Sequence, residues 1–491
     1  HYFFEPGKSF APARGSPMAR AVGGELIVDT GPLQVRMDPA SGGLFRDISL
    51  ARKTIAAAGA GDLILTVDDG RQPVPVRIHD WRMALEESTP TRASAKATGF
   101  WQNANGQAVA RVDVRCEFFQ GEAFIRIYHT LTWMTKDVKP GIRELTLALV
   151  PQLGQLQAAQ VGLDPYTADA VEATLDRASP VMAVQDKGDH FTVKAGAQVL
   201  KEGKTLGGWV AVRGTDGRSI AVSLRDAWQR YPTAFRIDGD RLQAQFCPPS
   251  QRLSFEQEAI MGPGIFNHPS WKRVRQIYKA PGNATHFYDN YSPNPGYIYT
   301  AEGAAFTHEV LLSFHDGKAG RTAAELNSAT QHPVVVRQDP VHAMRVPFMG
   351  FAIRPRDPGK NPEIERAVNQ IGRMAMGRWV GAQNFGLLRY GMVRWGRHEP
   401  IEDPNANFYR WMDNGQYGQQ LIPWLLYLRG GDRRFFDDAE LDSRYAMDMS
   451  TNHFNTRGSP TGYIAGCGSA LPFAPFGFSP GNMKMQKRSK P

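Results

Sequence analysis

The densest group of side chains able to do chemistry lies in two neighbouring segments, residues 384–399 and 407–417. Both segments mix arginines with aromatic residues. Flat aromatic rings stack on the faces of sugar rings, and the guanidinium fork of arginine binds a carboxylate through two hydrogen bonds. The combination predicts a site for an acidic sugar, formed by Arg389, Tyr390, Arg394, Trp395, His398, Tyr409, Arg410, Trp411, Asn414 and Tyr417. The alternative is that Trp395, Tyr409 and Trp411 are ordinary helix-packing aromatics.

Length and charge narrow the class of protein. A chain of 491 residues exceeds the roughly 250–300 residues of one domain, so at least two domains are expected. The 57 Lys+Arg and 48 Asp+Glu leave a net charge of +9, with no basic run of the kind that binds nucleic acid. This surplus suits an acidic polysaccharide, or it is simply a solvated basic surface. No stretch of about 18 apolar residues occurs, so we expect no membrane span.

Metal and cofactor motifs are scarce. The cysteines Cys116, Cys247 and Cys467 show neither CxxC spacing nor a paired framework, which argues against a disulfide scaffold and a cysteine zinc site. No His-x-x-x-His pair and no GxxxxGK or GxGxxG loop is present. We therefore predict no metal ligand set. The one cofactor left open is Ca²⁺, because residues 402–407 offer Asp and Asn oxygens.

The first two thirds of the chain have the pattern of strands. Val112, Val114, Cys116 and Phe118 alternate with polar residues, and the alternation resumes at Ile125 after a Gln-Gly turn. A period of two with Gly-rich turns is typical of antiparallel sheets packed face to face. We predict a large antiparallel β-(super)sandwich over residues 22–338.

A helical pattern follows. The string Asn361-Pro362-Glu363 combines a capping residue, a proline for the first helical position and an acid for the first turn. Further helices are expected from about Asn414 to Leu428 and from Asp432 onward. We predict a partial helical domain over residues 339–491, with an irregular tail from 471.

Several strings in order resemble one family, the exo-rhamnogalacturonan lyase/YetA-like proteins. In the helical part they are Arg389-Tyr390-Gly391, Trp411-x-Asp413-Asn414, Arg429-Gly430-Gly431-Asp432 and Ala446-x-Asp448; upstream they are Asp29-Thr30-Gly31-Pro32-Leu33, Arg225-Asp226-Ala227-Trp228 and Thr307-His308-Glu309. The resemblance implies a central β-sandwich followed by an α/α toroid, here truncated. Residues 1–21 would then be a linker or the remnant of an N-terminal barrel.

The resemblance also implies a bacterial-type lyase acting on an acidic, rhamnogalacturonan-type polysaccharide of pectin. For such a polymer we expect a secreted or periplasmic protein, although residues 1–20 carry no recognisable signal peptide.

β-Elimination sets three tasks for such a site. A cation or amide neutralises the uronate carboxylate, a base removes the C5 proton, and an acid protonates the departing O4. For proton transfer we favour Tyr390 or His453, with His398 and Tyr409 as further candidates. Arg394 and Arg410 are the expected carboxylate clamps. Arg389, Asn414, Trp395, Trp411 and Tyr417 complete the expected substrate-binding set. Which residue is base and which acid stays open.

Two other functions compete. A glycoside hydrolase would need two carboxylates about 5–10 Å apart, and Asp413 with Glu399 or Glu402 is a candidate pair. The third hypothesis is a non-catalytic carbohydrate-binding remnant.

Structural roles are predicted for three further groups of residues in the sandwich. We expect Arg225-Asp226-Trp228 to form a salt bridge between the domains with a packed indole, the alternative being a substrate-facing role. His129 should be a core histidine with satisfied hydrogen bonds. His308 and Glu309 should face opposite sides of one strand.

Overall fold

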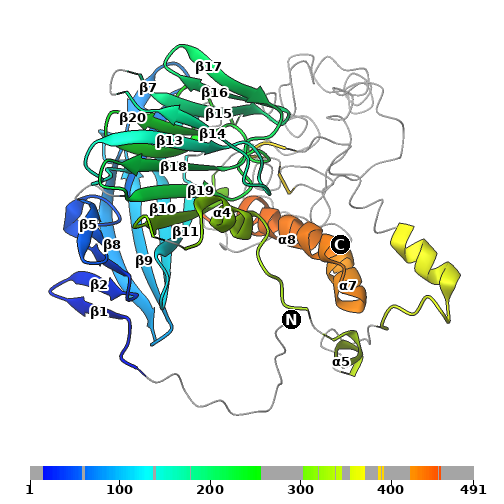
Figure 1. The fold of residues 1–491 in the computed structure, drawn as a ribbon. Helices are drawn as coiled ribbons and strands as arrows, with labels where there is room; N and C mark the ends of the chain where they lie inside the picture. The colour runs from blue at the N-terminus through cyan, green and yellow to red at the C-terminus, as the bar shows by residue number, and fades with distance from the viewer. Residues whose placement is uncertain are drawn as a thin grey trace, which may run out of the picture.

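The computed structural model describes residues 15–57, 61–135, 140–176, 179–255, 302–318, 320–337, 339–345, 354–370, 385–388, 390–391, 421–451 and 453–454. These residues form three antiparallel sheets followed by a few helices, so the predicted β-sandwich is present (Figure 1). No helix among them is long and apolar enough to cross a membrane.

The largest sheet has nine strands in the order β14-β13-β18-β19-β22-β11-β10-β9-β8. Their bounds are β8 Arg77–Ser88, β9 Arg92–Gln102, β10 Ala108–Phe119, β11 Phe124–Trp133, β13 Leu156–Gly162, β14 Ala170–Thr174, β18 Trp209–Gly214, β19 Ser219–Leu224 and β22 Ala305–His315. The predicted hairpin is confirmed, because β10 pairs with β11 from Ala110↔Trp133 to Glu117↔Arg126.

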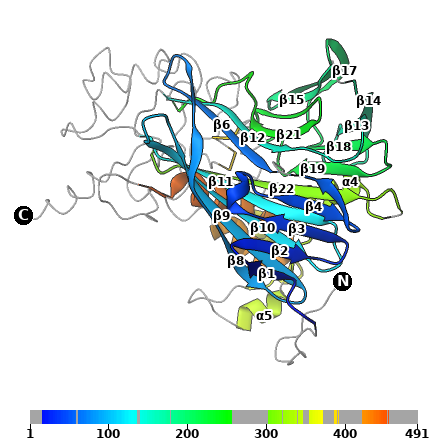
Figure 2. The same ribbon diagram turned by 90° about the vertical axis from the view of Figure 1, so that its left-hand side faces the viewer.

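The second sheet has eight strands in the order β17-β16-β15-β20-β21-β12-β6-β7. Their bounds are β6 Asp62–Asp68, β7 Pro73–Pro75, β12 Ile142–Leu149, β15 Val181–Lys187, β16 His190–Ala195, β17 Gln198–Gly203, β20 Thr233–Asp238 and β21 Arg241–Cys247. A third sheet, β1 Ala19–Val22, β2 Glu25–Asp29, β3 Leu33–Met37, β4 Asp47–Leu50 and β5 Lys53–Ala56, lies against β8 (Figure 2). A 3₁₀ turn, η1 (Pro39–Ser41), joins β3 to β4.

One continuous hydrophobic core contains the buried side chains of all three sheets. Val112, Val114, Cys116 and Phe118 are all buried there, as the alternation predicted. Burying such side chains supplies most of the driving force for the sandwich, since each contributes roughly 1.5–3 kcal/mol.

Helices cover the outer face of the nine-stranded sheet at two places. α4 (Ala323–Gln331) packs on β18 and β19, and it begins with a capping box between Thr322 and Glu325. The strand pattern predicted for the first two thirds of the chain did not include this helix, although the spacing of Thr322 and Glu325 marks its start. Farther along are α5 (Pro340–Arg345), residues 362–370, α7 (Leu421–Gly430), α8 (Arg433–Tyr445) and the π-helix η5 (Ala446–Ser450).

The predicted helix starts are confirmed at two positions. Residues 362–370 are helical, and Asp432 caps α8 by accepting the Arg434 N–H. α7 and α8 pack on each other around Leu426, Tyr427 and Phe435, a small cluster separate from the sandwich core. The described residues contain this helix pair and no closed ring of pairs.

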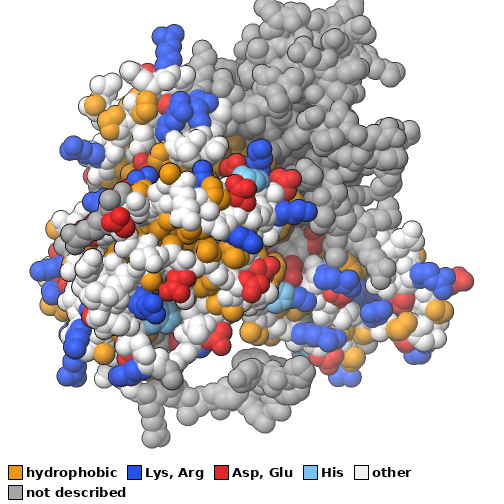
Figure 3. Space-filling model, turned by 45° about the horizontal axis from the view of Figure 1, so that its top comes forward, with side chains coloured by type: hydrophobic (Ala, Val, Ile, Leu, Met, Phe, Trp, Pro, Cys, Tyr) orange, Lys and Arg blue, Asp and Glu red, His pale blue; other side chains and the backbone are white. Residues whose placement is uncertain are grey.

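Charged side chains of both signs are interspersed over the face drawn in Figure 3. On that face the net positive charge is not gathered into one patch.

Candidate functional site

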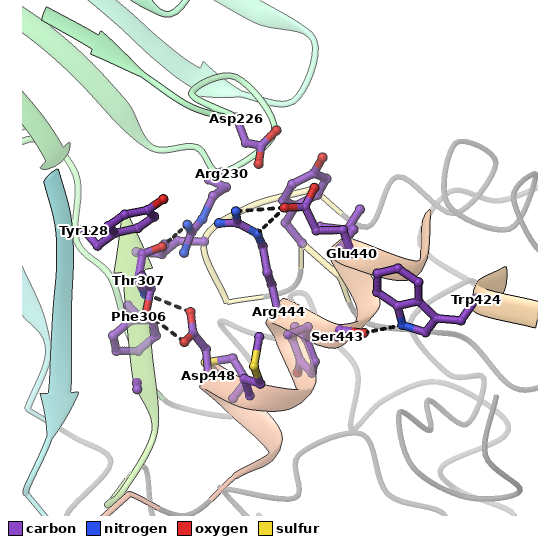
Figure 4. Close-up of a pocket in the computed structure, with 17 residues that line it drawn as sticks. Tyr128, Asp226, Arg230, Phe306, Thr307, Trp424, Glu440, Ser443, Arg444 and Asp448 are labelled. Carbon is purple, nitrogen blue, oxygen red and sulfur yellow. Dashed lines mark hydrogen bonds and ion pairs between the residues drawn. The ribbon is translucent and has the colours of Figure 1, made fainter. Parts of the chain in front are cut away.

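A cavity of about 440 Å³ lies where the nine-stranded sheet meets the helices. Its walls come from β11, β22, the turn after β19 and the C-terminal half of α8 with η5 (Figure 4). The polar residues lining it are Tyr128, Asp226, Arg230, Thr307, Tyr390, Glu440, Ser443, Arg444 and Asp448. Apolar residues, among them Phe306, Leu387 and Trp424, complete the lining. An apolar cavity with a few convergent polar groups is the usual form of a small-molecule site.

A network of five charged residues fixes α8 on the sheet beside this cavity. The Glu309 carboxylate, whose side chain is 1% exposed, lies 2.6 Å from Arg126, 3.1 Å from Arg225 and 3.1 Å from Arg444. On α8, Glu440 lies 2.7 Å from Arg225 and 2.9 Å from Arg444. Burial alone would raise the pKa of Glu309, but the three arginines lower it. The network therefore holds the α8 wall of the cavity in place.

The predicted salt bridge between the two parts of the chain is confirmed, because Arg225 of the sandwich binds Glu440 of α8 through two hydrogen bonds. The indole is also packed as expected, since the Trp228 ring centroid lies 4.8 Å from that of Phe385. Asp226 has no part in that bridge.

Asp226 lines the cavity from the turn after β19. Its φ of 57° is left-handed, a conformation that aspartate tolerates better than most residues. Its N–H donates to the Gln331 side chain at 3.0 Å, whereas its carboxylate has no hydrogen bond or ion pair among the described residues. Burial raises the pKa of this carboxyl, and Arg225, Arg444 and Arg230 only oppose the rise. A carboxyl of this kind is suited to exchanging a proton with a ligand.

Arg230 lies at the centre of the site, with Asp226 on one side and Asp448 on the other (Figure 4). Its guanidinium donates to the Thr307 carbonyl and forms no ion pair within the described residues. Burial lowers its pKa, while Asp448 and Asp226 act to raise it. A guanidinium carries five N–H donors, so most of this one stays available to an anionic ligand.

Two further groups face Arg230. Asp448 of η5 accepts hydrogen bonds from the Thr307 N–H at 2.9 Å and the Thr307 hydroxyl at 2.8 Å, yet burial raises its pKa. Tyr390 also lines the cavity, and its ring centroid lies 6.2 Å from that of Phe385. Burial raises the pKa of Tyr390 well above the usual 10, so its hydroxyl keeps its proton at neutral pH.

On the β11 wall, Arg126 lies over the Tyr128 ring at 5.5 Å from the centroid. Burial, reinforced by Glu309, raises the pKa of Tyr128 to about 12.

On the other face of β11 and β22, which points into the core, two histidines lie side by side. His308 points into the sandwich core while Glu309 points out, as predicted. His129 is also in the core, but the prediction of satisfied hydrogen bonds was wrong. None of the four ring nitrogens of His129 and His308 has a hydrogen-bond partner among the described residues. Both rings stack on Phe246, with centroids 5.2 and 4.2 Å away. Burial lowers the pKa of His129 to about 4 and that of His308 well below 6.5.

Of the predicted catalytic residues, the structure places Tyr390 in the cavity wall and His453 outside it. The His453 Nε2 lies 2.6 Å from the Met447 carbonyl, and its backbone N–H donates to the Gly303 carbonyl at 3.0 Å. It follows η5 in the chain and acts electrostatically on Asp448, so it lies near the site without lining it.

The other predicted residues lie outside the part of the chain that the structure describes. They are His398, Tyr409, Arg389, Arg394, Arg410, Trp395, Trp411, Asn414 and Tyr417, together with Asp413, Glu399, Glu402 and the candidate Ca²⁺ loop 402–407. Within the described part, no three His, Cys, Asp or Glu side chains are grouped as a metal site requires.

Sequence reasoning missed Asp226, Arg230 and Asp448 as members of one site. Asp226 and Arg230 follow directly after the apolar strand Ser219–Leu224, where polar side chains commonly line a site. That signal was available, but nothing in the spacing placed these residues opposite Asp448.

One family model supports the β-sandwich. Residues 18–156 match the family model described as the PcRGLX-like protein central beta sandwich domain. No curated protein sequence matches the chain.

Among solved structures, a protein in glycosyl hydrolase family 38 from Enterococcus faecalis matches 63% of this chain at 12% identity, with a TM-score of 0.35. A GH36 alpha-galactosidase from Geobacillus stearothermophilus matches 60% at 8% identity, with a TM-score of 0.33. A galactose mutarotase-like protein from Lactobacillus casei matches 60% at 12% identity, with a TM-score of 0.30. The matched part spans 32%, 40% and 100% of these three chains, respectively.

Proposed function

We propose that this protein is carbohydrate-active and cleaves an acidic, rhamnogalacturonan-type polysaccharide by β-elimination in the cavity between β22 and α8. The observation that carries the proposal is the Arg230 guanidinium, which is free of ion pairs within the described residues and lies between Asp226 and Asp448. The match of residues 18–156 to the PcRGLX-like sandwich family supports a carbohydrate partner.

In this mechanism Arg230 binds the uronate carboxylate and so makes the neighbouring C5 proton more acidic. Asp226, whose carboxylate has no hydrogen-bond partner among the described residues and whose pKa is raised by burial, removes that proton as the base. The electrons of the C5–H bond form the C4=C5 double bond as the C4–O4 bond breaks. Tyr390, which is still protonated, gives its proton to O4. Each bond broken is balanced by one formed, and no oxidant or reductant is needed.

One observation favours a second function, glycoside hydrolysis. Asp226 and Asp448 both line the cavity, and burial raises the pKa of each. A hydrolase uses two such carboxyls, one as acid and one as base or nucleophile. Asp226 and Asp448 are thus the hydrolase candidates among the described residues, whereas Asp413, Glu399 and Glu402 lie outside them.

The proposed function also implies a domain organisation. We infer that residues 22–338 and 339–491 are separate domains and that α7 and α8 begin an α/α toroid. The separate apolar cluster of α7 and α8 supports the division. A secreted or periplasmic location fits a polymer substrate, and binding without turnover is the remaining alternative.

The test is to incubate the protein with rhamnogalacturonan, homogalacturonan and glucuronan while following ultraviolet absorbance and new reducing ends. A lyase raises both signals, because it leaves an unsaturated uronate. Reducing ends without absorbance would instead establish hydrolysis, and saccharide binding with neither signal would establish a binding protein. Arg230→Gln should lower turnover at least 100-fold, whereas Arg213→Gln, an exposed arginine on β18, should have no effect.

A further inference from the structure

We propose that Tyr166 forms a second sugar subsite beside the cavity, on which a neutral pyranose residue of the same chain stacks next to the uronate. This inference rests on the proposed function. Nothing in the sequence pattern had singled out Tyr166.

Tyr166 is an exposed aromatic residue held in a fixed position. It is 56% exposed, whereas most aromatic side chains of the described residues are buried or half-buried. The Asp164 carboxylate accepts the N–H groups of Tyr166 at 2.8 Å and Thr167 at 3.0 Å, which fixes the turn. The ring meets His332 edge to face, with centroids 6.4 Å apart. A pre-positioned ring loses little entropy when a ligand stacks on it.

α4 places this ring beside Asp226. Asn327 donates to the Pro165 carbonyl at 3.1 Å, and Gln331 accepts the Asp226 N–H at 3.0 Å. These two side chains lie one helical turn apart, about 5–6 Å along the helix. His332, which contacts the Tyr166 ring, follows Gln331 directly. The ring is therefore a near neighbour of the proposed base.

The electrostatic couplings agree with this placement. Burial raises the pKa of the Tyr166 phenol, and the carboxylates of Asp226 and Asp437 raise it further. Tyr390, which lines the cavity, also responds to Tyr166. Asp437 belongs to α8, the helix whose residues Glu440 and Arg444 line the cavity.

The surrounding charges select the kind of sugar. Asp164 and Asp226 act on Tyr166 as negative groups, opposed by Arg225, which is occupied by Glu309 and Glu440. Asp437 also acts on Tyr166, but it is paired with Arg433 at 2.6 Å. A second uronate would be repelled by the Asp164 carboxylate, which forms no ion pair with a described residue. A neutral pyranose offers an apolar C–H face to the ring and no charge, so it suits this subsite.

The test compares binding of two oligosaccharides from rhamnogalacturonan, a disaccharide and a tetrasaccharide, by calorimetry. It uses the full chain with Asp226→Asn, so that no turnover intervenes. The tetrasaccharide should bind about tenfold more tightly than the disaccharide. Tyr166→Ala should abolish that gain and leave the disaccharide affinity unchanged. Tyr166→Phe should retain it, as should Val199→Ala, a matched exposed position on β17.

The outcomes separate this subsite from the proposed reaction. The subsite alone would be overturned if the wild type performs elimination but Tyr166→Ala still binds the tetrasaccharide more tightly than the disaccharide to the same degree. The reaction alone would be overturned if the wild type yields no unsaturated product while the tetrasaccharide still binds more tightly than the disaccharide and Tyr166→Ala removes that difference. Equal losses for both oligosaccharides in Tyr166→Ala would overturn the subsite. Absence of binding to either oligosaccharide would overturn both.

Discussion

Gln331, the last residue of α4, holds the backbone on both sides of Asp226. Its side-chain oxygen accepts the Asp226 N–H at 3.0 Å, and its side-chain nitrogen donates to the Leu224 carbonyl at 2.9 Å. Because Asp226 has a left-handed φ of 57°, these bonds stabilise a conformation that the turn would otherwise leave. A helix on the outer face of the sheet thus positions the proposed base.

Replacing Gln331 by Leu should therefore impair turnover without removing any group from the cavity. We expect kcat to fall about 10–100-fold and stability to fall by about 1–3 kcal/mol, because buried hydrogen bonds are lost. If the loosened turn exposes Asp226 to water, the acidic limb of the pH–rate profile should move to lower pH. An unchanged pH profile with lower stability would mean that Gln331 has only a structural role. Thr330→Ser, one residue earlier, is the control.

Asp226→Asn should make the protein more stable at neutral pH while abolishing turnover. A carboxyl whose folded pKa lies above its unfolded value stabilises the fold while protonated, and this contribution is lost as the pH rises through the folded pKa. The asparagine does not ionise, so the variant keeps this contribution as the pH rises. Its free energy of unfolding should therefore exceed that of the wild type at pH 7, and the difference should vanish below about pH 4. Thermal unfolding from pH 3.5 to 8 measures it. A variant less stable than the wild type at pH 7 contradicts the assignment.

The two adjacent core histidines, His129 and His308, should make the fold less stable as the pH falls, which is opposite to the effect of Asp226. His129 has a folded pKa of about 4, and that of His308 is also lowered, so both favour the neutral form in the fold. Their contribution to stability is complete above the unfolded pKa of about 6.5 and is lost as the pH falls toward 4. His129 alone should account for roughly 3 kcal/mol by pH 4.

His129→Leu should flatten that acid loss in urea unfolding measured between pH 4 and 7.5. His190→Leu is the control, because His190 is a partly exposed histidine on β16 whose ring pairs with Asp186. An equally steep loss in His129→Leu would show that other groups dominate acid unfolding.

Glu309→Gln should be among the most damaging single changes outside the apolar core. It leaves Arg126, Arg225 and Arg444 without the buried carboxylate that they share, which typically costs about 3–5 kcal/mol. Glu172→Gln breaks an exposed pair with Arg213 and should cost less than about 1 kcal/mol. Urea unfolding of the two variants gives the comparison, and equal costs would refute the structural role given to Glu309.

Local features of the fold could be predicted from the sequence. The alternation at Val112 and Val114 fixed which face of β10 is buried, and Asp432 marked the start of α8. The cavity could not be predicted in the same way. Arg230 approaches Thr307 only because β22 pairs with β11 and β19, and Asp448 reaches Thr307 from 141 residues farther along the chain. No periodic pattern carries such long-range pairings.

The position of β22 has a consequence for the order of synthesis. β22 lies between β19 and β11 in the nine-stranded sheet, although it comes after every other strand in the chain. Until residues 305–315 have left the ribosome, β14-β13-β18-β19 and β11-β10-β9-β8 are two ribbons with unpaired edges facing each other. Nascent chains ending before residue 305 should thus need protection from aggregation, and the ligand cavity cannot exist before the last strand is inserted.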